Sequence, residues 1–300
     1  MIDLWFLVPR TFNFEYAVDG YEFHALFSPH VYKITFTVVV TYLLSIPILQ
    51  NYMKDRKPYN LQKPLIIWNA FLSIFSTFGA IRCFTPMFQM FASSNGVLKT
   101  LCVNDYMHTK PEAFWGIAFM LSKLPELLDT YFLIFRKKKV IFLHWYHHAT
   151  VLTFCWLNYP YWNAGVVYYG AVNFFVHSLM YGYYSIASTR KFKIPKFISI
   201  FITSLQILQM VMGMWVHYRH FWLLLGKDGD KEKLEALTSD ASSAKISMSE
   251  VEFEKLTLQA NCHVTWDMWL LGVTIYSSYF VLFVKFFVGA YLTPRKVKGE

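Results

Sequence analysis

The chain has 300 residues, of which 55% are hydrophobic, 20% aromatic and 16% charged, with a formal net charge of +9. So apolar a composition excludes an ordinary soluble domain and indicates an all-α, polytopic membrane protein. The basic residues stand in short blocks between apolar segments, so no nucleic acid is expected as a partner.

Seven apolar stretches are long enough to cross the roughly 30 Å hydrocarbon layer of a membrane as helices. They are residues 31–53, 64–90, 113–135, 140–159, 162–187, 197–222 and 264–291. No internal repeat is visible, which predicts one helical domain over 31–292. Residues 1–30 then precede it, 226–263 form a polar insertion, and 293–300 form a tail.

The basic blocks at 54–57, 136–139, 190–196 and 295–298 all fall on one side of a seven-span arrangement. The positive-inside rule makes that side cytosolic. With an odd number of spans, the N-terminus is expected in the lumen and the C-terminus in the cytosol.

Polar side chains recur on four consecutive spans at a similar depth. They are Lys123, Glu126 and Asp129; His144, His147 and His148; Asn173, His177, Tyr181 and Tyr184; and Thr203, Gln206 and Gln209. At 1.5 Å per residue, all lie roughly 7 to 20 Å below the cytosolic boundary. Each set alone is typical of contacts between helices, but together they predict a site. His217, His220 and His263 are interpreted as interfacial residues near the other side.

These residues fall in four motifs: K-x-x-E-x-x-D-T from Lys123 to Thr130, H-x-x-H-H from His144 to His148, H-x-x-M-Y-x-Y-Y from His177 to Tyr184, and T-x-x-Q-x-x-Q from Thr203 to Gln209. In motif, order and spacing, residues 111–213 resemble the very-long-chain fatty acid elongases, the 3-oxoacyl-CoA synthases of the endoplasmic reticulum membrane. The polar insertion at 226–259 departs from the family's short loop.

The resemblance implies condensation of a long-chain acyl-CoA with malonyl-CoA, which releases CO2 and CoA and gives a 3-oxoacyl-CoA two carbons longer. It implies no cofactor and no metal, and an acyl-chain cavity enclosed by spans two to seven. Membrane lipid, the reductases and dehydratase of the elongation cycle and a second copy of the chain are the further partners expected. The residues after His144 favour the branch acting on saturated and monounsaturated chains.

Within this resemblance, we expect His147 to accept the acyl group, because Cys155 lies about 12 Å deeper on the same helix. His177 is expected as its proton partner or enolate stabiliser, with His144 and His148 beside it. Glu126 and Asp129 either orient the histidines or balance Lys123 at the malonyl group. Basic residues Arg136 and Lys137 are expected to hold CoA phosphates, although anionic lipid or topogenesis also explains them.

Two other classes fit parts of the pattern. Membrane di-iron desaturases and hydroxylases also carry H-x-x-H-H boxes, but they need about twice the four histidines found at this depth. A seven-helix receptor would match the topology without explaining the polar layer.

Two further expectations concern the cysteines on the lumenal side and the lysines of the C-terminal tail. Cys102 and Cys262 both fall on the lumenal side, where a disulfide competes with two free thiols. Lys296 and Lys298 form a K-x-K-x-x pattern, which predicts retrieval to the endoplasmic reticulum, although the positive-inside rule alone also accounts for them.

Overall fold

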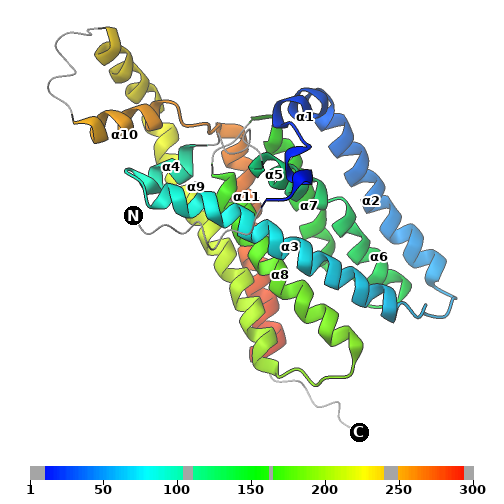
Figure 1. Ribbon diagram of the computed structural model, residues 1–300. Helices are drawn as coiled ribbons and strands as arrows, with labels where there is room; N and C mark the ends of the chain where they lie inside the picture. Colours follow the sequence, from blue (N-terminus) through cyan, green and yellow to red (C-terminus); the bar gives the residue numbers. More distant parts are fainter. Residues whose placement is uncertain (1–10, 104–110, 162–164, 240–248, 294–300) are drawn as a thin grey trace.

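The computed structural model describes residues 11–103, 111–161, 165–239 and 249–293, and every regular element among them is helical (Figure 1). The longest helices are α2 (Val31–Met53), α3 (Gln62–Phe91), α8 (Val166–Thr189), α9 (Lys196–Ser239) and α11 (Trp266–Phe287). The shorter ones are η2 (Asn13–Tyr16), α1 (Gly20–Phe27), η3 (Ser28–His30), α4 (Gly96–Cys102), α5 (Glu112–Ser122), η5 (Pro125–Leu127), α6 (Leu128–Phe135), α7 (Phe142–Asn158), η6 (Tyr159–Tyr161), α10 (Glu250–Ala260) and the π-helical η8 (Val288–Leu292). The predicted all-α fold is confirmed.

Four of these segments have the length and apolarity needed to cross a membrane, so the chain is a multi-pass membrane protein. They are Gly20–Met53, Gln62–Phe91, Lys196–Glu235 and Trp266–Leu292, which contain most of the first, second, sixth and seventh expected spans. The fourth expected span corresponds to α7, with 17 residues, and the fifth to α8. The count of seven spans stays a prediction.

Residues 113–135 do not form the single helix that was expected. α5 ends at Ser122, and the N–H groups of Leu124 and Leu127 each donate to the carbonyl three residues back. Pro125 is the physical reason, because it has no N–H to donate to the carbonyl four residues back and its ring crowds that carbonyl. Side chains three residues apart eclipse in the resulting tight turn, which brings Lys123 and Glu126 together.

The helices pack in pairs. α3 lies along α8, α9 along α11, and α2 against α6 and α7 (Figure 1). The α3–α8 contact is close because a Cβ on Gly79 would stand 2.6 Å from the Phe174 ring. The Ser73 hydroxyl also donates to the Ser178 carbonyl across this contact, at 2.8 Å. Small residues and hydroxyls of this kind hold helices together in an apolar medium.

The N-terminal residues 11–30 pack into the helical domain through Glu15, which is fully buried. Its carboxylate accepts two hydrogen bonds from the Arg82 guanidinium, at 2.8 and 3.0 Å, and one from the Trp115 indole at 2.7 Å. Burial acts to raise the pKa of Glu15, but the bonds from Arg82 and Trp115 outweigh it and hold this pKa below its usual value. The segment expected before the domain is therefore anchored inside it.

The insertion begins as a continuation of the sixth expected span, because α9 runs on without a break from Lys196 to Ser239. Its second helix, α10, lies against α9 and α4, and α10 and the C-terminal end of α9 stand away from the bundle at one end (Figure 1). Glu254 of α10 accepts hydrogen bonds from Ser94 and Asn95 and pairs with Lys99 at 2.7 Å.

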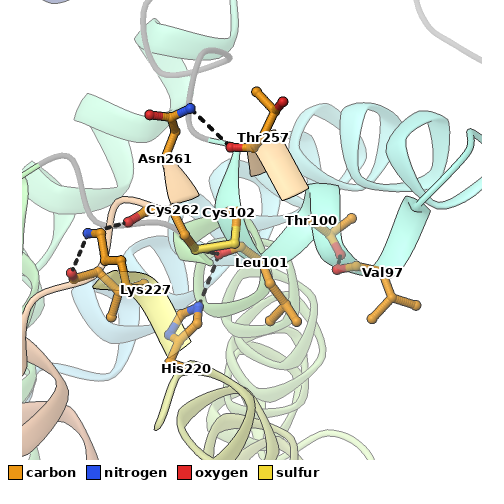
Figure 2. The surroundings of a disulfide bond; sticks show 10 residues. Val97, Thr100, Leu101, Cys102, His220, Lys227, Thr257, Asn261 and Cys262 are labelled. Atoms are coloured by element: carbon orange, nitrogen blue, oxygen red, sulfur yellow. Dashed lines mark hydrogen bonds between the residues drawn. A yellow bond between two sulfur atoms is a disulfide. The ribbon is translucent and has the colours of Figure 1, made fainter. Parts of the chain in front are cut away.

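A disulfide joins Cys102 to Cys262, the pair considered from the sequence, with an S–S distance of 2.09 Å (Figure 2). It links the end of α4 to the segment before α11, and Lys227 of α9 donates to the Cys262 carbonyl at 2.8 Å. Cys83 and Cys155 are free thiols. Lys296 and Lys298 lie outside the described residues, so the retrieval signal stays a prediction.

Candidate functional site

A cavity of about 450 Å³, called here the wide cavity, lies among α3, α6, α7, α8, α9 and α11. Its polar wall contains the four histidines of the predicted layer, together with Asp129, Tyr181, Tyr184, Gln206, Asn69, Ser188, Arg136 and Lys139. Phe132, Phe283, Phe286 and aliphatic side chains complete it. The structure therefore brings residues from four of the predicted motifs to one space.

The three α7 histidines form a contiguous group. The ring centroids of His144 and His148 are 4.6 Å apart, and those of His147 and His148 are 5.7 Å apart. Their helical spacing places them on one face, as expected. The Nδ1 atoms of His147 and His148 are buried and have no hydrogen-bond partner in the described part of the chain.

A second, narrower cavity of about 100 Å³, called the apolar cavity, extends from His147 toward the end that carries the disulfide. Aromatic and aliphatic residues line most of it, among them Phe119, Phe154, Cys155 and Tyr276. Arg82, Glu112 and Asn158 bring polar groups to it as well. Of the described residues, His147 alone lines both cavities.

A hydrogen-bonded chain supports His177 from behind the wide cavity. The Lys123 ammonium donates to Glu126 at 2.8 Å and to the Asn173 carbonyl oxygen at 3.2 Å. Asn173 therefore turns its NH₂ group toward His177 Nε2, at 3.3 Å. His177 Nε2 accepts this bond, so the ring proton is on Nδ1, which faces Glu126 at 3.9 Å.

Lys123 and Glu126 are buried, at 2% and 4% exposure, and line neither cavity among the residues the structure describes. Their position fits the orienting role considered for the carboxylates better than direct contact between Lys123 and a substrate.

Asp129 is held by different partners. The Trp68 indole donates to one carboxylate oxygen at 2.7 Å and the Tyr181 hydroxyl to the other at 2.8 Å. These bonds join α3, α6 and α8 at the wall of the wide cavity. Within the described residues Asp129 makes no hydrogen bond or ion pair to a histidine, and Glu126 is the carboxylate that faces one.

His144 is held by a hydroxyl that sequence reasoning did not select. Its Nε2 lies 3.0 Å from Thr130 Oγ1, and that oxygen lies 2.7 Å from the Tyr42 hydroxyl of α2. Thr130 is the last residue of the first motif, and this position could have identified it as a candidate site residue. Tyr42 and Trp68 lie on other helices with no sequence pattern that connects them to the site.

The residues expected to bind substrate divide between the cavities. Arg136, Tyr181, Tyr184 and Gln206 line the wide cavity, whereas Asn173 and Gln209 line the apolar cavity.

Two of the expected residues point elsewhere. Lys137 donates to the Lys54 carbonyl at 2.8 Å, and Thr203 donates to the Ser199 carbonyl at 2.9 Å and contacts Tyr291. Neither is among the described residues that line the two cavities.

The interpretation of His217 and His220 as interfacial residues is wrong, because their exposures are only 3% and 4%. His217 donates through Nδ1 to the Gly213 carbonyl at 2.7 Å, and His220 donates through Nε2 to the Leu101 carbonyl beside the disulfide at 3.0 Å (Figure 2). Helix packing encloses the His217 ring, since a Cβ on Gly272 would stand 1.9 Å from its Nε2 atom. His263 is exposed.

Within the described ranges, no group of three or more His, Cys, Asp or Glu side chains is placed to hold a metal ion.

Comparisons with known proteins give one consistent result. The sequence model of the ELO family (GNS1/SUR4 family) matches residues 29–299. The chain is 37% identical over 252 residues to very long chain fatty acid elongase 6 of Drosophila melanogaster, covering 84% of this chain and 70% of the relative. It is 37% identical over 266 residues to mouse very long chain fatty acid elongase 3, covering 87% and 83%.

The human very long chain fatty acid elongase 3 is 33% identical over 291 residues, covering 97% of this chain and 93% of the relative. These matches extend well beyond the four motifs, and they do not favour the desaturase alternative. The chain belongs to the ELO family, whose relatives here are named as fatty acid elongases.

Proposed function

We propose that this protein is the condensing enzyme of fatty acid elongation, a very-long-chain 3-oxoacyl-CoA synthase. It joins a long-chain acyl-CoA to malonyl-CoA with loss of CO2 and CoA. The observation that carries this proposal is the position of His147, which lines both a polar cavity and an apolar one. The reacting thioester carbon of an acyl-CoA lies between an apolar hydrocarbon chain and the polar CoA carrier. A residue that acts on this carbon must therefore lie where an apolar space meets a polar one.

The two cavities suit the two parts of an acyl-CoA. Arg136 and Lys139 in the wide cavity offer positive charge for CoA phosphates. The apolar cavity removes hydrocarbon from water, which favours an acyl tail there. The thioester carbon then lies near His147. Helices of a seven-span bundle enclose both cavities in this proposal.

His147 is the nucleophile in the first half-reaction. An imidazole nitrogen attacks the thioester carbon, the C–S bond breaks, and CoA leaves as the thiolate, which takes up the imidazole proton. His144 and His177 are less suited to attack, because each has its Nε2 atom occupied by a neighbouring side chain.

In the second half-reaction malonyl-CoA loses CO2, and the electron pair of the broken C–C bond forms an enolate. The enolate carbon attacks the acyl carbon, the C–N bond to His147 breaks, and the imidazole regains a proton from the medium. His177, backed by Glu126 and Lys123, is placed to stabilise charge in this step, with His148 beside it. The chemistry needs no cofactor or metal.

The setting belongs to the same proposal. The chain lies in the endoplasmic reticulum membrane with its N-terminus in the lumen and its C-terminus in the cytosol. The reductases and dehydratase of the cycle act on its product, and saturated or monounsaturated chains are its substrates. A panel of acyl-CoAs graded in length and unsaturation tests the last point, and a preference for polyunsaturated chains would contradict it.

Mass spectrometry of the protein incubated with acyl-CoA alone tests the acyl-enzyme. We expect release of CoA and an acyl adduct on His147. The adduct should be absent from His147→Asn and present in His148→Asn, the matched variant one residue along. An unmodified His147 peptide in protein that is fully active with both substrates would favour direct condensation without an acyl-enzyme.

A further inference from the structure

Three polar side chains form a buried chain of contacts that connects α2 to the wide cavity. Tyr42 is 2% exposed and Thr130 is fully buried. The Tyr42 hydroxyl lies 2.7 Å from Thr130 Oγ1, which in turn lies 3.0 Å from Nε2 of His144. α2 contributes no residue to the described lining of either cavity, so this contact is its route to the site.

The protons in this chain can be placed by satisfying every hydroxyl. If Tyr42 donates to Thr130 and Thr130 donates to His144 Nε2, both hydroxyl protons have acceptors. If His144 donated instead, either the Tyr42 or the Thr130 proton would lack an acceptor among the contacts in the described residues. Buried polar groups are rarely left unpaired, so the first arrangement holds.

A histidine that accepts at Nε2 carries its proton on Nδ1 when neutral. His144 lines the wide cavity, and its Nδ1 makes no hydrogen bond to any residue that the structure describes. The ring therefore offers an N–H donor that no protein group uses.

We propose that Tyr42 and Thr130 are positioning residues that hold His144 as its Nδ1–H tautomer, so that His144 donates a hydrogen bond to a thioester oxygen in the wide cavity. The identity of that oxygen rests on the proposed condensation. Negative charge develops on thioester oxygens both when the acyl group is transferred and when the enolate forms. A donor fixed in advance stabilises such charge without reorganising.

His144 and His147 have different contacts and therefore different proposed roles. His147 has a ring nitrogen with no partner in the described chain and lies where the cavities meet, as a nucleophile requires. His144 is committed to Thr130 on one side and is left with a donor on the other. For the two residues to exchange roles, the proton on each ring would have to move to the other nitrogen.

The tautomer is measured first, on resting protein without substrates. Nitrogen NMR of ¹⁵N-histidine-labelled protein in lipid nanodiscs, with His144 assigned by subtraction of a His144→Gln spectrum, should show Nε2 unprotonated and Nδ1 protonated. Thr130→Val should change this pattern and Thr130→Ser should preserve it. A protonated Nε2 in the wild-type protein would overturn the proposal, whether or not condensation is the true reaction.

Kinetics then test the donor. At saturating acyl-CoA and malonyl-CoA, Thr130→Val should lower kcat about tenfold or more, with a smaller change in KM, because the donor acts on developing charge. Thr130→Ser should recover most of kcat. Tyr42→Phe should lower kcat by roughly threefold and give mixed tautomers, because Thr130 loses its donor but keeps its own proton.

Tyr131→Phe is the matched control, because it removes a hydroxyl bond to Ser45 across the same α2–α6 contact without touching His144. It should keep both the tautomer and kcat. An equal loss of kcat in Tyr42→Phe and Tyr131→Phe, or an unchanged tautomer in Thr130→Val, would show that the contact only holds the helices together. If the wild-type protein shows the expected tautomer but does not catalyse condensation, the proposed function is rejected, whereas the role of Tyr42 and Thr130 in fixing the His144 tautomer is kept.

Discussion

Two histidine clusters lie in this protein, and they differ in what their ring nitrogens contact. At the wide cavity, His147 and His148 each have a buried nitrogen without a partner in the described chain. Near the disulfide, His217 and His220 each donate to a backbone carbonyl, beside a space of only about 20 Å³. The residue type is the same in both places, and His148 is buried like His217 and His220, whereas His147 is half-buried.

The comparison shows that burial alone does not mark a functional histidine. A buried ring that donates to a carbonyl satisfies the backbone and fixes a helix, whereas a ring that has an unpartnered nitrogen and lines a large cavity can react. The expected functional difference between the clusters can be tested directly.

The largest effect should come from the pair His147→Asn and His217→Ala. Removal of the nucleophile should lower condensation at least ~10³-fold with little change in thermal unfolding. Removal of the packed His217 ring should cost roughly 2–3 kcal/mol of stability and leave the rate per folded molecule nearly unchanged. Malonyl-CoA incorporation and unfolding temperature in detergent measure the two. A similar loss of activity in both variants would break the comparison.

The second effect concerns Glu15 of the N-terminal segment, which is bound by Arg82 and Trp115 of the helical domain. Glu15→Gln should destabilise the fold by about 3 kcal/mol, because the charge of Arg82 then lacks this carboxylate. Glu254→Gln, at the partly exposed pair with Lys99, should move the unfolding temperature by no more than ~1 °C. Equal shifts in the two variants would mean that the burial of Glu15 confers nothing special.

The same carboxylate predicts a pH dependence. Because the folded-state pKa of Glu15 is lowered, its stabilisation is fully present above the usual value of 4.5 and is lost as pH falls below it. Glu15→Gln should flatten this part of the curve of unfolding temperature against pH.

The smallest effect distinguishes open space from packed space along α8. A Cβ at Gly170 would meet nothing within 4 Å, since this residue lines the apolar cavity. Gly170→Leu should fold normally but lower turnover of the longest acyl-CoAs about tenfold, with a smaller loss for shorter ones and for Gly170→Ala. Gly79→Ala, which would clash with Phe174, should instead lower stability. Uniform loss across all chain lengths in Gly170→Leu would contradict a tail in this cavity.

Much of this architecture could be predicted from sequence. Long apolar runs located α2, α3, α9 and α11, because hydrophobicity is a local property of the chain. The spacing of His144, His147 and His148 placed them on one face for the same reason. The break before Pro125 was readable in principle, since proline acts on its own neighbourhood.

The contacts between helices could not be predicted in this way. The bond from Tyr42 to Thr130 spans 88 positions in the sequence, and that from Trp115 to Glu15 spans 100. No local pattern encodes such a pairing. The burial of His217 also depends on Gly272, a neighbour that only helix packing supplies.

The Cys102–Cys262 bond also determines how the covalent chain is connected. It closes a ring across a sequence separation of 160 that contains α5 to α10, and therefore all four cavity histidines. A single peptide cleavage anywhere between the two cysteines opens this ring without releasing a fragment. Such a nicked molecule migrates as one species until its thiols are reduced.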